Sequence, residues 1–257
     1  MLRQLRFLIL LSLLISACGS ASASPSIEPT AVPPLPTPTL TPSPLLPIPE
    51  ATVPTPAALP SQPISRVLIV SFDGLRPDAI EAADMTTVKA LMQSGAYTLT
   101  AQTIMPSITL PAHASMVTGT CPAKHIARWN EYVPQNGYAL GTDIFDLTHA
   151  VGLRTVLITG KEKLRHITEP GSTDYFGFVD NTDENKDQTT IETMAMEQIR
   201  QGFGLMLLHF PDGDIAGHEY DWMSKQQLRA FHDKDRSLGL LLEVMKDSGF
   251  YDGTLII

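Results

Sequence analysis

Apolar runs rich in β-branched residues recur along the chain and predict the strands of a buried sheet. They span Arg66–Phe72, Leu153–Thr159 and Gly204–Phe210, and a fourth begins at Thr254. A continuous apolar run, in contrast to an alternating one, is typical of a parallel strand that is covered on both faces. A further extended segment, Tyr97–Met105, is also predicted to be a strand.

The segments between these runs place apolar residues at helical spacing and carry helix start and stop signals. The predicted helices are Thr86–Gln93, Asp143–Val151, Thr190–Gln201 and Ser224–Asp247. This alternation of strands and helices predicts an α/β fold, with a doubly wound, mostly parallel sheet flanked by helices. The acidic stretch Asp180–Gln188 is predicted to be a solvated loop without chemistry.

One acidic residue, Asp235, falls on the apolar stripe of the last predicted helix. A buried carboxylate at this position could orient a metal-bound histidine. Because charged side chains are seldom buried, we expect instead that Asp235 lies at the edge of the stripe and is solvated.

The first 64 residues do not have the pattern of a folded domain. Residues 1–18 combine a basic start with an apolar run too short to span a membrane, which predicts a signal peptide. Its end, Ile15-Ser-Ala-Cys18, resembles the lipobox of bacterial lipoproteins, so Cys18 is expected to be lipidated and to anchor an extracytoplasmic protein to a membrane. A plain signal peptide with an incidental cysteine is the alternative. Residues 19–64 hold 14 of the 21 prolines and almost no charge, which predicts a disordered linker.

Composition narrows the class of function. Residues 65–257 are enough for one domain with its own core. The formal net charge is −9 and no Lys/Arg cluster follows the signal peptide, which excludes a basic face for nucleic acid. Cys121 is the only other cysteine, so an intramolecular disulfide is excluded once Cys18 is lipidated. The segment Cys121-Pro-Ala-Lys124 does not match a sulfatase signature, and we expect Cys121 to be structural.

Polar residues with possible chemistry follow the predicted strands. Asp73 comes directly after the first, and open α/β sheets bind ligands at the carboxyl ends of their strands. Thr109 stands where a short helix should begin, with Pro111 in the first turn, so it is a helix N-cap, a nucleophile beside free backbone N–H groups, or both. Asp214 and His218 are four residues apart and share one helical face, where they could bind one cation. An Asp-Gly turn, a helix cap and a surface hydrogen bond are the ordinary alternatives.

These residues belong to three motifs that follow one another in the chain. The motifs are Ser71-Phe-Asp-Gly-Leu-Arg-Pro-Asp78, Met105-Pro-Ser-Ile-Thr-Leu-Pro-Ala-His113 with Val117-Thr-Gly119, and Pro211-Asp-Gly-Asp-Ile-Ala-Gly-His218. Through them the domain resembles the type I phosphodiesterase/nucleotide pyrophosphatase family of the alkaline phosphatase superfamily. The resemblance implies the fold of that superfamily and covers residues 67–257.

The resemblance also implies a site with two divalent metal ions, most simply Zn²⁺. Asp73 and Thr109 would bind one ion, Asp214 and His218 would bind the other, and Thr109 would be the nucleophile. Asn130 would donate to a phosphoryl oxygen.

The loop that leads to this asparagine departs from the family pattern, His-Gly-Ile-x-x-Asn. Asn130 lies five residues after His125, as in the pattern, but Ile126 stands in place of the glycine.

The implied reaction is hydrolysis of a phosphodiester or nucleotide pyrophosphate bond in a small substrate, through a phospho-threonine intermediate. The alternatives are a phosphomonoesterase, a phosphonoacetate-type hydrolase, or a tethered domain without catalysis. The family pattern places further metal ligands beyond Ile257, so we expect the domain to be incomplete at its C-terminus and this chain by itself to be inactive.

Overall fold

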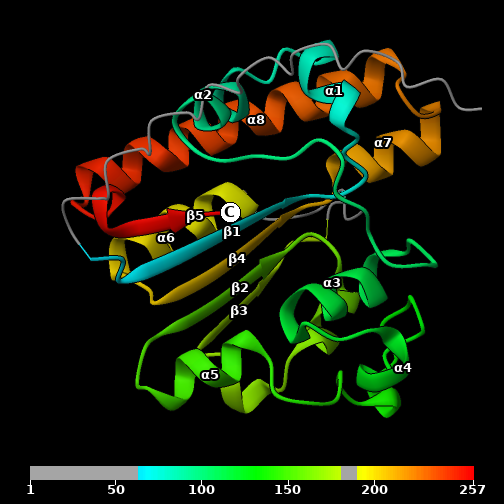
Figure 1. The fold of residues 1–257 in the computed structure, drawn as a ribbon, viewed down its shortest axis with the longest axis vertical. Helices are drawn as coiled ribbons and strands as arrows, with labels where there is room; N and C mark the ends of the chain where they lie inside the picture. The colour runs from blue at the N-terminus through cyan, green and yellow to red at the C-terminus, as the bar shows by residue number, and fades with distance from the viewer. Residues whose placement is uncertain (1–62, 181–189) are drawn as a thin grey trace, which may run out of the picture. The chain divides into compact units, whose positions relative to one another are not determined.

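The computed structural model describes residues 63–180 and 190–257. A five-stranded, all-parallel sheet in the order β3-β2-β4-β1-β5 lies at the centre of these residues (Figure 1). The strands are β1 (Arg66–Phe72), β2 (Thr155–Thr159), β3 (Tyr175–Phe178), β4 (Leu205–Phe210) and β5 (Thr254–Ile256). The predicted signal peptide, Cys18 and the linker as far as residue 62 lie outside the described residues, as do residues 181–188 of the predicted loop and the residue that follows them.

Helices precede and follow the strands along the chain. The α-helices are α1 (Pro77–Ala82), α2 (Thr86–Ser94), α3 (Thr109–Thr118), α4 (Pro122–His125), α5 (Ile144–Ala150), α6 (Ile191–Gln201), α7 (Asp212–Tyr220) and α8 (Lys225–Asp247). Short 3₁₀ helices are η1 (Pro134–Asn136), η2 (Glu162–Ile167), η3 (Pro170–Ser172) and η4 (Tyr251–Gly253). None of the helices in the described ranges is long and apolar enough to cross a membrane.

The two faces of the sheet carry separate apolar cores because side chains alternate along each strand. Leu68, Met206 and Leu208 pack with residues of α6 and α8 on one face. Ile69 and Leu207 pack with α3, α5 and η2 on the other. Figure 1 shows the resulting three layers, with α6 and α8 on one side of the sheet and α3, α4 and α5 on the other. The predicted doubly wound, parallel α/β architecture is confirmed.

The prediction of a strand over Tyr97–Met105 is wrong, since no strand forms there and most of its side chains are exposed. The backbone N–H of Thr100 bonds to the hydroxyl of Thr98 at 3.3 Å and not to a neighbouring strand. Threonine hydroxyls often compete with sheet hydrogen bonds in this way. The short strand β3 was not predicted; it has only four residues, with Gly177 among them.

The prediction that Asp235 is solvated is also wrong. The residue is 1% exposed, and its two carboxylate oxygens accept the backbone N–H groups of Thr87 at 2.8 Å and Val88 at 2.9 Å. These donors lie in the first turn of α2, whose N-cap residue Met85 supplies no side-chain cap. Because buried backbone donors need partners, the carboxylate from α8 caps α2 and does not orient a histidine.

Candidate active site

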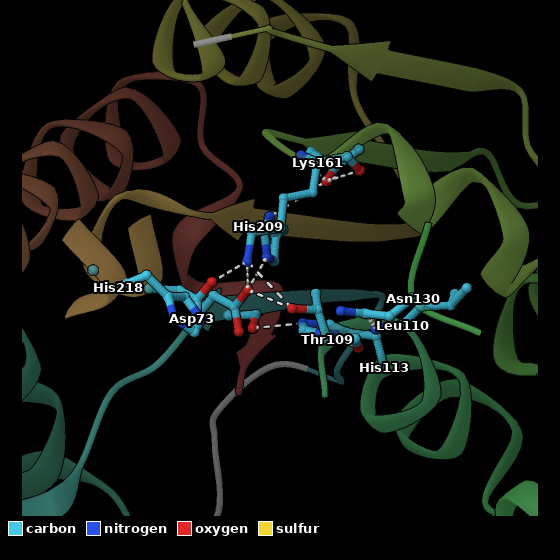
Figure 2. A network of polar contacts seen from close by, with 12 residues as sticks. Asp73, Thr109, Leu110, His113, Asn130, Lys161, His209 and His218 are labelled. Carbon is cyan, nitrogen blue, oxygen red and sulfur yellow. Dashed lines mark hydrogen bonds and ion pairs between the residues drawn. The ribbon is translucent and has the colours of Figure 1, made fainter. Parts of the chain in front are cut away.

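The polar residues of the candidate site lie at the carboxyl ends of the three central strands. His209 of β4 pairs in register with Thr159 of β2 on one side and with Ser71 of β1 on the other. Just past this level, the chain continues from β1 to Asp73 and from β2 to Lys161. Parallel strands end at a common edge of the sheet. Side chains from segments that are distant in sequence therefore lie close together at this edge (Figure 2).

Lys161 lies at the centre of this cluster. Its Nζ is 2.5 Å from Asp73 Oδ2 and 3.2 Å from Thr109 Oγ1, and it also contacts Asp214 Oδ2. The three charged side chains are only 13%, 12% and 16% exposed for Lys161, Asp73 and Asp214. One ammonium thus holds two carboxylates and the candidate nucleophile together. The sequence reasoning missed Lys161, although its position directly after an apolar strand is the same signal that identified Asp73.

Thr109 is the first residue of α3, and the N-cap is Ile108. The prediction that Thr109 caps the helix is therefore wrong. Its hydroxyl donates to Asp73 Oδ2 at 3.1 Å, and the residue is 8% exposed. As predicted, Pro111 lies in the first turn, where its missing N–H costs no hydrogen bond. Because Thr109 is the first residue of α3, its hydroxyl lies at the positive end of the helix dipole.

His113 fixes the start of α3 against the sheet. Its Nδ1 lies 2.8 Å from the carbonyl oxygen of Thr109 and therefore carries the proton, while Nε2 lies 2.8 Å from Ser71 Oγ and accepts from that hydroxyl. Burial, together with the nearby His209, lowers the pKa of His113 to about 4. The imidazole is thus neutral at ordinary pH, and it positions the backbone of the candidate nucleophile.

Asp73 remains ionised. Burial by itself would raise its pKa, but the hydrogen bond and charge of His209, with the charge of Lys161, hold the pKa of Asp73 well below its usual range. The Nε2 of His209 lies 3.3 Å from Asp73 Oδ2, and its Nδ1 lies 3.3 Å from the hydroxyl of Thr159. A carboxylate with such a low pKa is a poor general base and a good partner for a cation. His209 was not predicted, because a histidine inside an apolar run gives no pattern of its own.

Asn130 lies beside the first turn of α3. Its Oδ1 accepts the backbone N–H of Leu110 at 3.0 Å, which fixes the orientation of the amide. The Nδ2 group is left to donate to another oxygen.

Ile126 lies in the loop before Asn130, at the position where the family pattern has glycine. This residue adopts φ 58°, the left-handed conformation that favours the glycine of the family pattern. His125 is fully buried and anchors the loop, because its Nε2 pairs with Ser115 Oγ at 2.9 Å. Cys121 precedes α4 with a free, exposed thiol and makes none of the contacts around Thr109.

Asp214 and His218 lie on one face of α7, as predicted. The Nε2 of His218 is 3.5 Å from Asp214 Oδ1, and the imidazole packs edge-on against Trp222 with 5.3 Å between ring centroids. The side chain of His218 is 72% exposed. Gly74 allows α7 to approach Asp73, since a Cβ at Gly74, which has φ 76°, would lie 3.0 Å from the Cα of Asp214.

The donors brought together suit divalent cations in type but are few in number. Asp73 with Thr109 and Asp214 with His218 form two adjacent pairs joined through Lys161. Within the described ranges, no group of three or more His, Cys, Asp or Glu side chains is placed to hold a metal ion. A protein zinc site has about three or four protein ligands, so each pair would need further ligands.

Solved structures of similar fold include an ectonucleotide pyrophosphatase/phosphodiesterase and a phosphonoacetate hydrolase. Murine ectonucleotide pyrophosphatase/phosphodiesterase 5 is 18% identical with a TM-score of 0.59, over 74% of this chain and 55% of that one. An inactive threonine-to-alanine variant of the murine protein, in complex with AMP, matches with the same TM-score. Phosphonoacetate hydrolase from Sinorhizobium meliloti, in complex with phosphonoacetate, is 21% identical with a TM-score of 0.51, over 71% of this chain and 54% of that one.

The chain thus spans little more than half the length of these structures. Direct comparison with curated protein sequences gives no match. The family model of type I phosphodiesterase/nucleotide pyrophosphatase, by contrast, matches residues 67–257, which include every residue of the candidate site. The chain belongs to the type I phosphodiesterase/nucleotide pyrophosphatase family.

Proposed function

We propose that the chain carries the nucleophile-bearing part of a metal-dependent hydrolase of phosphate esters, with phosphodiester or nucleotide pyrophosphate bonds as substrates. One observation carries this proposal. The Thr109 hydroxyl, at the positive end of α3, lies 3.1 Å from an ionised carboxylate and 3.2 Å from an ammonium group. A threonine hydroxyl with only a structural role does not need an ionised carboxylate and an ammonium group beside it.

In this proposal Thr109 Oγ1 attacks the phosphorus atom in line with the leaving group, the bond from phosphorus to that group breaks, and Thr109 becomes phosphorylated. The hydroxyl proton passes to solvent, and water then hydrolyses the phospho-threonine, which releases the phosphorylated product and restores the hydroxyl. Asp73 accepts the hydroxyl hydrogen bond and holds Oγ1 in place. Lys161 and the positive end of α3 stabilise the negative charge that develops near this oxygen. The Nδ2 group of Asn130 donates to a non-bridging phosphoryl oxygen.

The metal ions are part of the proposal. Asp73 and Thr109 would hold one ion, Asp214 and His218 would hold the other, and Zn²⁺ suits this mixture of oxygen and nitrogen donors. Further ligands are needed to complete either site. Bound divalent ions would lower the pKa of the threonine hydroxyl and neutralise the charge of the phosphoryl group.

The similar structures guide the choice of substrate. The AMP complex of the murine protein supports a nucleotide substrate, and its inactive threonine-to-alanine variant supports a threonine nucleophile. The phosphonoacetate complex keeps a phosphonate hydrolase as the second candidate. Rates on a nitrophenyl nucleotide diester, a nitrophenyl monoester and phosphonoacetate separate the diesterase, monoesterase and phosphonate activities.

The direct test compares the full-length protein with its Thr109→Ala and Thr109→Ser variants in the presence of Zn²⁺. Hydrolysis of the diester should fall at least about 1,000-fold in the alanine variant and less in the serine variant, which keeps a hydroxyl. Phosphate bound covalently to the protein should disappear with Thr109→Ala. Undiminished turnover in this variant would rule out the nucleophile, and a wild-type protein without turnover on all three substrates would favour the tethered, non-catalytic domain.

We also propose that the protein is exported and anchored to a membrane through Cys18. The support is the sequence of residues 1–18 alone. Labelled fatty acid should be incorporated into the wild-type protein and not into a Cys18→Ser variant; equal labelling of both would refute the anchor.

A further inference from the structure

Asn130 lies in a segment, residues 129–138, that has few attachments to the rest of the domain. The segment contains no strand and only the short helix η1, and all of its residues are exposed or half-buried. Among the described residues, hydrogen bonds join it to the rest of the domain at two places. One is Asn130 Oδ1, which accepts the backbone N–H of Leu110 at 3.0 Å (Figure 2). The other is the ring of His166.

The imidazole of His166 bonds to the backbone of this segment through both of its nitrogens. Nε2 accepts the backbone N–H of Val133 at 3.0 Å, and Nδ1 donates to the carbonyl oxygen of Gly137. These roles follow because a backbone N–H only donates and a carbonyl oxygen only accepts. His166 is 2% exposed, so water does not compete for either bond.

Two aromatic side chains close to Asn130 in the sequence pack on the same imidazole. Trp129 meets it edge-on with 5.4 Å between ring centroids, and Tyr132 lies tilted at 5.2 Å. Such contacts add a preferred geometry to the burial of apolar surface. His166 therefore contacts the segment one residue before Asn130 and two residues after it, and a shift of the ring would move Asn130.

His166 is itself fixed relative to the candidate nucleophile. It lies in η2, where its neighbours Leu164 and Ile167 are fully buried. Both belong to the apolar core that includes Leu110, the residue after Thr109. Because close-packed side chains cannot shift independently, the packing of η2 on α3 sets the position of the imidazole relative to Thr109.

We propose that His166 is a positioning residue for the Asn130 amide. Its ring holds residues 129–138 against η2, so Asn130 Oδ1 stays bonded to the N–H of Leu110 and the Nδ2 group is held ready for the phosphoryl oxygen. Without the ring, one hydrogen bond would have to hold the whole segment. This inference rests on the role that the proposed function gives to Asn130, and it adds that the donor is preorganised before substrate binds.

Hydrogen exchange at the backbone amide of Leu110, measured by NMR on the full chain, reports the position of Asn130 without substrate or metal. His166→Phe keeps an aromatic ring and removes both hydrogen bonds. Exchange of the Leu110 amide should become about tenfold faster and approach the rate in Asn130→Ala, which lacks the acceptor. An unchanged Leu110 rate in His166→Phe would overturn the proposal.

The matched control is His232→Phe. His232 is a half-buried histidine of α8 whose Nδ1 bonds to the carbonyl oxygen of Ala83 at 3.1 Å. This variant should leave the Leu110 rate unchanged, even if urea denaturation shows a loss of stability similar to that of His166→Phe. An equal rise in both variants would mean that Leu110 exchange follows overall stability, and it would refute the positioning role.

A second substitution covers the case in which His166→Phe does not fold. The amide of His166→Gln can replace Nε2 as the acceptor for Val133 but cannot also replace Nδ1. Exchange of Leu110 should then rise by a smaller factor, about threefold. No rise in this variant would contradict the proposal.

Activity gives a readout that a purely structural role would not move. On the nitrophenyl nucleotide diester, His166→Phe should lower kcat about tenfold and should have no further effect when Asn130 is already replaced by Ala. Equal losses in the two backgrounds would refute the action of His166 through Asn130. A wild-type protein without turnover would contradict the proposed function alone, because exchange of the Leu110 amide would still decide whether His166 positions Asn130.

Discussion

Two buried aspartates show how differently one side chain can be used in this fold. Asp235 accepts two consecutive backbone N–H groups of α2, one on each oxygen. Asp73 receives three side chains on a single oxygen, Oδ2, from Lys161, Thr109 and His209. The first carboxylate is bound by backbone that cannot move away without unfolding a helix. The second is bound by groups that can be displaced.

This difference separates a structural acid from a functional one better than burial does. Both side chains are largely hidden from solvent. A carboxylate with fixed partners contributes to stability and has no capacity for a ligand. A carboxylate whose partners are an ammonium and a hydroxyl can exchange them for a metal ion or a substrate.

The largest expected effect is on the free energy of unfolding and concerns Asp235. Replacing Asp235 by Ala removes the acceptors of two part-buried N–H groups of α2, and the free energy of unfolding should fall by about 3 kcal/mol. Asp235→Asn keeps one acceptor oxygen and should lose about half as much. Urea denaturation at neutral pH measures both. A loss below about 1 kcal/mol for the alanine variant would show that α2 has another cap.

The next effect comes from the site and depends on pH. The pKa of His113 is about 4 in the folded protein, and about 6.5 in an unfolded chain. Between these two pKa values, the unfolded chain binds more protons at His113 than the folded protein does. The contribution of His113 to the free energy of unfolding is therefore fully present above the unfolded pKa and is lost as the pH falls toward the folded pKa. The expected loss between pH 7 and pH 5 is about 2 kcal/mol. Urea titrations of wild type and His113→Asn isolate this contribution, and parallel pH profiles of the two proteins would contradict it.

Removing Lys161 tests whether the partners of Asp73 are exchangeable. The ammonium lies between the carboxylates of Asp73 and Asp214 and repels any other cation. Lys161→Met should therefore raise the affinity for Zn²⁺ about tenfold or more, as measured by calorimetry. Lys163→Met is the control, because Lys163 is within the electrostatic range of both carboxylates but contacts neither. Unchanged or weaker Zn²⁺ binding in Lys161→Met would show that the partners of Asp73 are no more exchangeable than those of Asp235.

The smallest effect concerns the loop that delivers Asn130 to the site. Ile126 adopts φ 58°, which is unfavourable for a branched side chain. Ile126→Gly should stabilise the protein by about 0.5–1 kcal/mol. This gain is the backbone strain relieved in the folded protein minus the extra conformational entropy that glycine loses on folding. Ile126→Ala retains the Cβ and should show no such gain in urea denaturation. Destabilisation by the glycine variant would mean that contacts of the Ile126 side chain hold the loop.

Much of the fold was predictable because the strands β1, β2, β4 and β5 are contiguous apolar runs and the helices between them carry start and stop signals. The errors come from segments in which local chemistry competes with the pattern. The run Tyr97–Met105 has strand composition, but Thr98 and Thr100 bond to each other and the run pairs with none of the five strands. The strand β3 is half-buried and interrupted by Gly177, which weakens its signal.

The candidate site was predicted in part for a similar reason. Asp73, Thr109 and Asp214 follow recognisable motifs, and the fold brings them together. Lys161 and His209 were missed because their roles depend on which strands are neighbours, and apolar periodicity does not give the order of strands. Asp235 was misread because the helix that it caps lies 148 residues earlier in the chain.

The position of β1 in the sheet has a consequence for how the protein forms. The first strand to leave the ribosome is flanked by the two later strands β4 and β5, and hydrogen bonds join residues 136 and 188 positions apart. At about 5–20 residues per second, β1 waits roughly ten seconds or more for its first partner. Such non-local pairing slows folding, and an apolar strand without a partner is prone to aggregate. During synthesis this segment is therefore the part of the domain with the greatest need of a chaperone, and the contact of Asp73 with His209 forms only after 136 further residues have been made.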